Sequence, residues 1–206
     1  MDSTVLDLVI VGLGPAGLTA SLYAKMYGLQ AIGVGDVVGG KLISAPLIVD
    51  YPSQTGIKGI DFIAALLSQV KEQACELLVD DVIQIIKLDP QGFEIYTKSQ
   101  KALQAKNVLI ASGNSNKQYL NRARKLLTHL GVNLVNGFIV VNDRFESSVS
   151  NIFSAGDCIQ YPRSLEQLTT AVTSAIQATA CIYEKLKQAK PPILWGKTKI
   201  PRIVKV

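Results

Sequence analysis

A glycine-rich turn near the start of the chain constrains the fold more than any other feature. Before it, residues 5–11 form a nearly continuous apolar run, which is typical of a buried parallel strand. The turn itself, Gly12-Leu13-Gly14-Pro15-Ala16-Gly17, fits the pattern G-x-G-x-x-G. Residues 15–27 then predict a helix that ends near Gly28, and residues 30–34 predict a second strand. A strand–helix–strand unit of this size predicts a right-handed crossover.

Each glycine of this turn has a physical role in binding a dinucleotide. Gly12 permits the tight turn off the strand, Gly14 lets a pyrophosphate approach the backbone, and Gly17 lets helix and strand pack closely. The free N–H groups and the positive end of the helix dipole then favour a diphosphate. Dinucleotide binding is therefore expected, the alternative being a turn of purely structural origin. Asp36, near the end of the second strand, is either a ribose ligand or a solvated loop acid.

The rest of the chain predicts further α/β structure. We expect a loop over 37–59, helices over 60–78 and 169–186, and a polar, then helical and basic segment over 114–130. We expect strands over 82–88, 92–97, 107–111, 138–141 and 152–155, the first two joined by a hairpin turn at 89–92. The last strand runs into Gly156-Asp157, which delivers a backbone amide and a carboxylate near the start of a helix.

The basic charge of the chain is confined to its C-terminal end. The net charge is +5 over 206 residues, but the stretch from Glu184 to Val206 holds seven Lys/Arg and one acid, against 14 basic and 15 acidic residues elsewhere. The neutral body argues against nucleic-acid binding. No apolar stretch reaches the roughly 20 residues that cross a bilayer, and no signal sequence is evident. We therefore expect no membrane association and a cytoplasmic protein.

The cysteine and histidine content excludes several kinds of site. Cys75, Cys158 and Cys181 are far apart, so there is neither a CxxC pair nor a zinc-ligand spacing, and we expect no metal site. The single histidine, His129, is expected to lie at a helix end rather than in a catalytic triad. Cys158, directly after Asp157, is the one candidate for a catalytic thiol; the alternative is a small residue filling a tight turn.

Five segments, in order along the chain, resemble the flavoprotein disulfide reductases, and the thioredoxin reductase-like branch most closely. They are the Gly12–Gly17 turn, Gly39-Gly40-Lys41-Leu42 (similar to G-G-Q-L), Val49-Asp50-Tyr51-Pro52 (similar to V-E-N-aromatic-P), a strand ending in Ala111-Ser112-Gly113 (similar to A-T-G), and Ile152–Asp157 (similar to V-F-A-A-G-D). Gln167 and the Ala-rich helix after it also match. The resemblance implies an α/β fold with one Rossmann-like FAD-binding domain, a parallel sheet with a hairpin layer, and FAD as cofactor.

The resemblance also implies which residues contact FAD. The glycine turn would hold the pyrophosphate, Asp157 a ribityl hydroxyl, and the helix from about Glu166 would point its positive end at the flavin ring. Lys41 and Asp50 stand where the branch has Gln and Asn, so the contacts there are altered. The full set of expected cofactor-binding residues is Gly12, Gly14, Pro15, Ala16, Gly17, Asp36, Gly40, Lys41, Leu42, Asp50, Val82, Ala111, Ser112, Gly113, Gly156, Asp157, Gln167 and Leu168.

One part of the resembled branch has no counterpart here. The branch inserts a second Rossmann domain for NAD(P)H, carrying its CxxC pair, between the A-T-G strand and the second FAD motif. Such a domain needs roughly 100–150 residues, yet only residues 114–136 separate Gly113 from Gly137. We therefore expect an FAD-binding domain over 1–187 with a short linker and helix at 114–136, no separate NAD(P)H domain, and a basic tail over 188–206.

Three functions stay open on this basis. The first is an FAD-dependent oxidoreductase related to, but not itself, a thioredoxin reductase, with free NAD(P)H or a redox protein as electron donor. The second is a non-enzymatic flavin-binding subunit or sensor within a complex, and the third a flavin-free NAD(P)-binding protein. The resemblance implies a homodimer. Trp195, in the tail, either stacks on an uncovered flavin face or packs against the body or another subunit.

Overall fold

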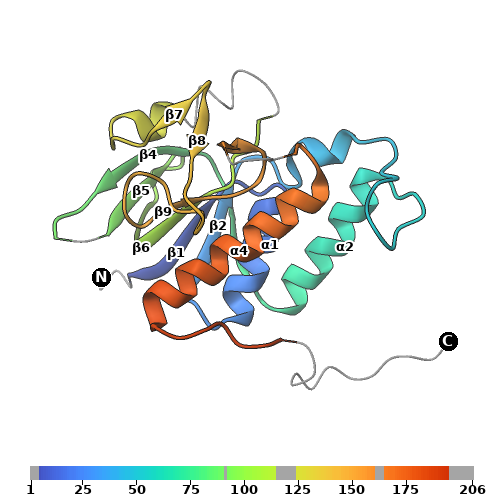
Figure 1. Cartoon of the computed structure of the whole chain (residues 1–206), viewed down its shortest axis with the longest axis horizontal. Coiled ribbons are helices and arrows are strands. Elements are labelled where there is room, and N and C mark those ends of the chain that lie inside the picture. Colours follow the sequence, from blue (N-terminus) through green and yellow to red (C-terminus); the bar gives the residue numbers. More distant parts are fainter. Residues whose placement is uncertain (1–4, 91, 115–123, 161–164, 195–206) are drawn as a thin grey trace.

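A mostly parallel sheet forms the centre of the fold in this computed structural model, which describes residues 5–90, 92–114, 124–160 and 165–194 (Figure 1). Five parallel strands lie in the order β3-β2-β1-β6-β9. Their bounds are Glu76–Val79 for β3, Ala31–Gly35 for β2, Leu6–Val11 for β1, Ala102–Ile110 for β6 and Ile152–Ser154 for β9. Val9 lies between Ile32 of β2 and Val108 of β6. This central position explains why β1 is apolar almost throughout.

Two further strands extend the sheet by a meander. β4 (Val82–Lys87) pairs antiparallel with β5 (Phe93–Thr97), and β5 pairs antiparallel with the first half of β6. A separate small sheet consists of β7 (Leu134–Val135), β8 (Phe138–Val140) and β10 (Ile159–Gln160). The predicted fold class, a parallel sheet with a hairpin layer, is thus confirmed.

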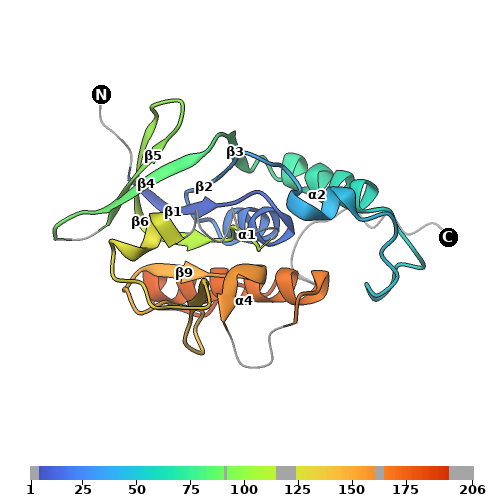
Figure 2. The same cartoon turned by 90° about the horizontal axis from the view of Figure 1, so that it is seen from above.

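Three long helices lie side by side, with α1 between the other two (Figure 1). They are α1 (Pro15–Met26), α2 (Gly59–Glu72) and α4 (Leu168–Lys187). Two short 3-10 helices, η1 (Gly40–Ser44) and η2 (Gly156–Cys158), lie in the connections after β2 and β9. Figure 2 shows α4 running alongside β9. The two glycine turns of the sequence, Gly12–Gly17 before α1 and Gly156-Asp157 before α4, lie in one region of the fold.

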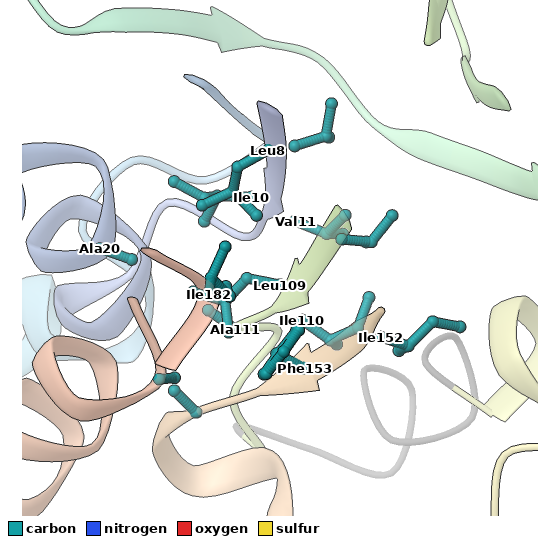
Figure 3. Close-up of a cluster of buried hydrophobic side chains, with 14 of the residues drawn as sticks. Leu8, Ile10, Val11, Ala20, Leu109, Ile110, Ala111, Ile152, Phe153 and Ile182 are labelled. Carbon is teal, nitrogen blue, oxygen red and sulfur yellow. The ribbon is translucent and has the colours of Figure 1, made fainter. Parts of the chain in front are cut away.

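The main hydrophobic core lies where the sheet meets α1 and α4. Leu8 and Ile10 of β1 and Leu109 of β6 are fully buried, together with Phe153 of β9 and Ile182 of α4 (Figure 3). Burying a large apolar side chain stabilises a fold by about 1.5–3 kcal/mol. The core therefore fixes the strand ends from which the turns of the site emerge.

The structure corrects several sequence-based boundaries. Residues 76–79 form strand β3 and not the end of a helix: α2 stops at Glu72, and the chain turns at Ala74, whose φ is 49°. A short apolar run fits helix or strand equally, and here the free edge of β2 decides. β6 begins at Ala102, because residues 102–105 pair with β5, and the expected loop over 37–59 contains η1. Trp195 and the rest of 195–206 lie outside the described residues.

Candidate functional site

A pocket of about 620 Å³ opens at the carboxyl ends of β1, β2 and β6. Open α/β sheets bind their ligands at this edge, and small-molecule pockets typically measure roughly 300–1,000 Å³. The walls come from the turn after β1, from η1, from the residues that follow β6 and β9, and from the start of α4. Segments far apart in the sequence therefore share one concave surface.

The glycine turn forms the floor of this pocket through tight backbone packing. Gly12 has a φ of 113°, and its N–H donates to the carbonyl of Val34 at 2.7 Å. A Cβ at Gly17 would lie 1.8 Å from the carbonyl oxygen of Gly12, so only glycine allows α1 to approach the turn this closely. Gly17 is accordingly the one expected cofactor residue that does not line the pocket.

Gly14 behaves differently from the other two glycines of the motif. A Cβ added there would meet no atom within 4 Å, so the missing side chain leaves open space above the backbone. Gly14 also precedes α1 directly, with Pro15 in the first turn of the helix. The open N-terminus of a helix combined with a bare backbone is a favourable place for a phosphate group.

A second wall is built from η1, which is anchored to the glycine turn. The Gly39 N–H donates to the carbonyl of Leu13 at 2.7 Å, and a Cβ at Gly40 would lie 3.3 Å from the Gly14 Cα atom. Leu42 of η1 lines the pocket, as does Asp50 further along the chain. Asp36, at the end of β2, also lies on the lining.

The residues after β6 and the first residue of β4 also contribute to the site. Ala111, Ser112 and Gly113 follow β6, and the Ala111 N–H donates to the carbonyl of Val11 at 2.8 Å. The Oγ atom of Ser112 is buried and makes no hydrogen bond within the described parts of the chain, although it lies near the Cys158 thiol. Val82, the first residue of β4, also lines the pocket.

The turn after β9 places Gly156 and Asp157 at the pocket. Gly156 has a φ of 77°, and its N–H donates to the Ser174 hydroxyl of α4 at 2.9 Å. Gln167 is the N-cap residue of α4, and both it and Leu168 line the pocket. The positive end of the α4 dipole therefore faces the same space as the N-terminus of α1.

Two carboxylates of the site approach the ammonium group of Lys41. Its ammonium nitrogen lies 2.5 Å from the Oδ2 atom of Asp157 and 3.7 Å from the Oε2 atom of Glu166. It also donates a hydrogen bond of 2.9 Å to the Oδ1 atom of Asn114. The Lys41 side chain is 44% exposed, whereas that of Asp157 is 11% exposed. No sequence pattern predicts this contact, which joins two candidate cofactor residues to one another.

Cys158 does not belong to the pocket. The residue is 1% exposed, and its thiol contacts the Ser154 hydroxyl at 3.2 Å and the carbonyl of Ala155 at 3.3 Å. Burial raises the pKa of the Cys158 thiol, which disfavours the reactive thiolate. The Cys158 side chain is therefore buried and does not line the pocket.

The remaining candidates of the sequence also lie outside the pocket. The His129 Nε2 donates to the carbonyl of Ile85 in β4 at 2.7 Å, just after the helical residues 124–128. Within the ranges that the structure describes, no group of three or more His, Cys, Asp or Glu side chains is arranged to hold a metal ion. Over the same ranges, no helix has the length and apolar character needed to cross a membrane.

Sequence reasoning missed part of the lining. The additional residues are Val11, Leu13, Val34, Gly35, Val37, Ser44, Ala45, Leu47, Ile48, Asp81, Asn114, Leu126, Glu166 and Ala171. Some were within reach of the sequence, because Asn114 follows the A-S-G segment directly and Gly35 ends a predicted strand. The apolar wall from Leu47 and Ile48 carried no such signal, because it depends on how the η1 segment folds back.

Comparisons with known proteins assign the family. The profile described as "Pyridine nucleotide-disulphide oxidoreductase" matches residues 6–123 and 120–175. A thioredoxin reductase of Listeria innocua is 28% identical over 132 residues, which cover 64% of this chain and 41% of that protein. A ferredoxin–NADP reductase of Lactococcus lactis subsp. cremoris is 31% identical over 186 residues, covering 85% of this chain and 56% of that protein. The chain thus spans about half the length of these relatives.

Solved structures agree on the fold. A thioredoxin reductase from Streptococcus pyogenes superposes with a TM-score of 0.78 at 17% identity, covering 91% of this chain and 100% of the other. A ferredoxin-flavin thioredoxin reductase from Clostridium acetobutylicum gives a TM-score of 0.75 at 18% identity, with coverage of 89% and 99%. Only residues 111–133 lie between β6 and β7, so no nucleotide-binding domain is inserted there. The chain belongs to the pyridine nucleotide-disulphide oxidoreductase family, is related to thioredoxin reductase, and lacks the central NAD(P)H domain.

Proposed function

We propose that the chain binds FAD in this pocket and acts as a flavin-dependent oxidoreductase. The observation that carries the proposal is the open space over Gly14, enclosed between the starts of α1 and α4. A pyrophosphate at this place would face the positive end of α1 and could accept hydrogen bonds from backbone N–H groups of the turn other than those of Pro15, which has none, and Gly12, which already donates to Val34. The pocket residues fit an extended dinucleotide, because they reach from Val82 past the glycine turn to Gln167.

Other residues would hold the rest of the cofactor. Asp157 would accept hydrogen bonds from hydroxyl groups of the cofactor, and the buried Ser112 hydroxyl would offer one polar contact. The α4 N-terminus favours negative charge on an adjacent ring system. A bound flavin would supply hydride and electron transfer, while the chain itself would bind, orient and partly desolvate it. We assign no acid–base residue, since His129 donates to a backbone carbonyl outside the pocket.

The proposed electron donor follows from two features of the sequence, the missing CxxC pair and the short segment over residues 114–136. No CxxC pair is present, so we do not propose reduction of a thioredoxin disulfide. With only residues 114–136 in place of an inserted domain, NADH or NADPH would react as a transient, freely diffusing donor, or a redox protein would deliver electrons instead. The name of one relative, a ferredoxin–NADP reductase, supports a redox-protein donor.

A visible absorption spectrum of the purified protein, followed by anaerobic titration with NADH and NADPH, tests this function. We expect a flavin spectrum with bound FAD, and bleaching by at least one reduced donor. A colourless protein that takes up NAD but not FAD on reconstitution would overturn the proposal in favour of a flavin-free NAD(P)-binding protein.

A second candidate is a flavin-binding subunit or sensor that exchanges electrons only within a complex. The short 114–136 segment favours it, because a dedicated nicotinamide site is missing. Steady-state NAD(P)H oxidation with oxygen or an artificial acceptor separates the two: absence of turnover with both nicotinamides would favour the subunit. We further propose a cytoplasmic homodimer, which light scattering of the FAD-loaded protein would test.

A further inference from the structure

The side chain of Lys41 links opposite walls of the pocket. Its backbone belongs to η1, which is fixed to the glycine turn through Gly39 and Gly40. Its ammonium group reaches the turn after β9 at Asp157, the end of β6 at Asn114, and Glu166 just before α4. One cation therefore connects four segments around the space in which a ligand would lie.

This ion pair occupies a group that a ligand would need. At 2.5 Å from the ammonium, the Oδ2 atom of Asp157 is engaged in a charge-assisted contact, and the Asp157 side chain is only 11% exposed. A hydroxyl group is a weaker donor to a carboxylate than an ammonium group is. A ligand that offers Asp157 only hydroxyl groups must therefore share or displace the stronger partner.

We propose that Lys41 competes with the bound cofactor for Asp157 and is thereby a specificity-determining residue of the pocket. The competition weakens the binding of ligands that approach Asp157 with neutral hydroxyl groups. The inference rests on the proposed function, because FAD is the ligand with which it is tested. The Lys41 side chain is 44% exposed and can move into solvent when it is released, so the ion pair can open and is not a permanent block.

The primary experiment is an equilibrium titration of the FAD-free protein with FAD, followed by quenching of flavin fluorescence. In Lys41→Gln, a neutral side chain of similar length frees the Asp157 carboxylate, and we expect FAD to bind roughly fivefold more tightly, which corresponds to about 1 kcal/mol. Lys71→Gln, at an exposed position in the last turn of α2, removes the same charge away from the pocket and should leave the affinity unchanged. High salt screens the Lys41–Asp157 ion pair and should reduce the difference in FAD affinity between the wild type and Lys41→Gln.

A ligand-free measurement supports the same point by a separate route. A double-mutant cycle of urea unfolding with Lys41→Gln, Asp157→Asn and the double variant should show coupling without FAD. With saturating FAD the coupling should fall, because the ammonium no longer holds the carboxylate. In the Asp157→Asn background, Lys41→Gln should give no gain in FAD affinity.

The outcomes separate this inference from the proposed function. If neither the wild type nor Lys41→Gln binds FAD, the proposed function fails and this inference fails with it. If the wild type binds FAD and Lys41→Gln binds it equally or less tightly, only the competition is overturned; weaker binding would make Lys41 a direct contact of the cofactor. A cycle with no coupling in the FAD-free protein would likewise overturn the competition alone.

Discussion

Two parts of the pocket differ in whether backbone or side-chain atoms form them. The floor, from Gly12 to Gly17, is backbone packed against backbone, with Gly17 tight against Gly12 and open space only over Gly14. Elsewhere the lining includes a charged pair of side chains, in which Lys41 is joined to Asp157. The floor is therefore dictated by steric necessity, whereas the charged pair can change by single substitutions without disturbing the fold. The difference predicts that floor mutations act on folding or abolish binding, and that mutations of the charged pair adjust affinity.

Gly17→Ala should produce the largest effect. Its Cβ would lie 1.8 Å from the Gly12 carbonyl oxygen, a backbone atom that cannot move aside cheaply. We expect a loss of at least about 3 kcal/mol in the free energy of unfolding, measured by urea denaturation. Gly14→Ala, the same change three residues earlier where the space is open, is the matched control and should cost less than about 1 kcal/mol. Equal stability of the two variants would contradict the steric account of the floor.

Gly14→Val should separate binding from folding. The added side chain has room in the protein but enters the space where a pyrophosphate would approach. We expect FAD affinity to fall by roughly 100-fold or more, or about 2.7 kcal/mol, with the unfolding midpoint nearly unchanged. A variant that stays yellow through gel filtration would place the dinucleotide elsewhere.

Asp157→Ala should have a smaller effect on FAD binding and Asp36→Ala a smaller one still. Asp157 is 11% exposed and lies at the turn after β9, so removing it deletes a carboxylate acceptor in a partly desolvated position. We expect roughly tenfold weaker binding, or about 1.4 kcal/mol, in fluorescence titrations. If Asp36→Ala weakens binding more, the ribose contact at the end of β2 dominates and the nucleotide is placed differently.

Asp7→Asn should affect stability and leave the pocket intact. Asp7 lies on β1 but at the end away from the glycine turn, and it accepts hydrogen bonds from the Lys106 ammonium at 2.8 Å and the Gln30 N–H at 3.2 Å. Burial acts to raise the pKa of Asp7, but the contacts with Lys106 and Gln30 outweigh it and hold the pKa below its usual value of 3.8. We expect Asn to cost about 1 kcal/mol in unfolding free energy at neutral pH.

The pH dependence gives this prediction its sign. Because the folded pKa lies below the unfolded one, the stabilisation by Asp7 is complete above the unfolded pKa and is lost as pH falls through the folded pKa. The gap in stability between the wild type and Asp7→Asn should therefore close in acid, below about pH 4. If this difference in unfolding free energy is constant from pH 7 to pH 3, the shape of the Asp7 side chain and not its charge determines the stabilisation. A change in FAD affinity in Asp7→Asn would show that the two ends of β1 are not independent.

The sequence predicts the backbone-built half of the site better than the charged half. The glycines, the apolar strands and the Gly156-Asp157 turn are local patterns with local causes, and the cofactor-binding residues expected from them line the pocket, apart from Gly17. The Lys41–Asp157 pair joins two distant segments, and no local pattern specifies it. The error over residues 76–79 has the same origin, because a free edge of β2 decides the conformation of an ambiguous run.

Because Cys158 is buried, the rate at which its thiol reacts with a reagent can report local opening of the fold around the turn after β9. Its thiol is enclosed between β6 and the turn after β9, whereas Cys75 and Cys181 are half-buried. In a native-state labelling experiment with a thiol reagent, the two half-buried cysteines should react through small local fluctuations. Cys158 should be modified only when the turn after β9 separates from the sheet. Its labelling rate, with and without FAD, would therefore measure how firmly a bound cofactor holds the two halves of the domain together.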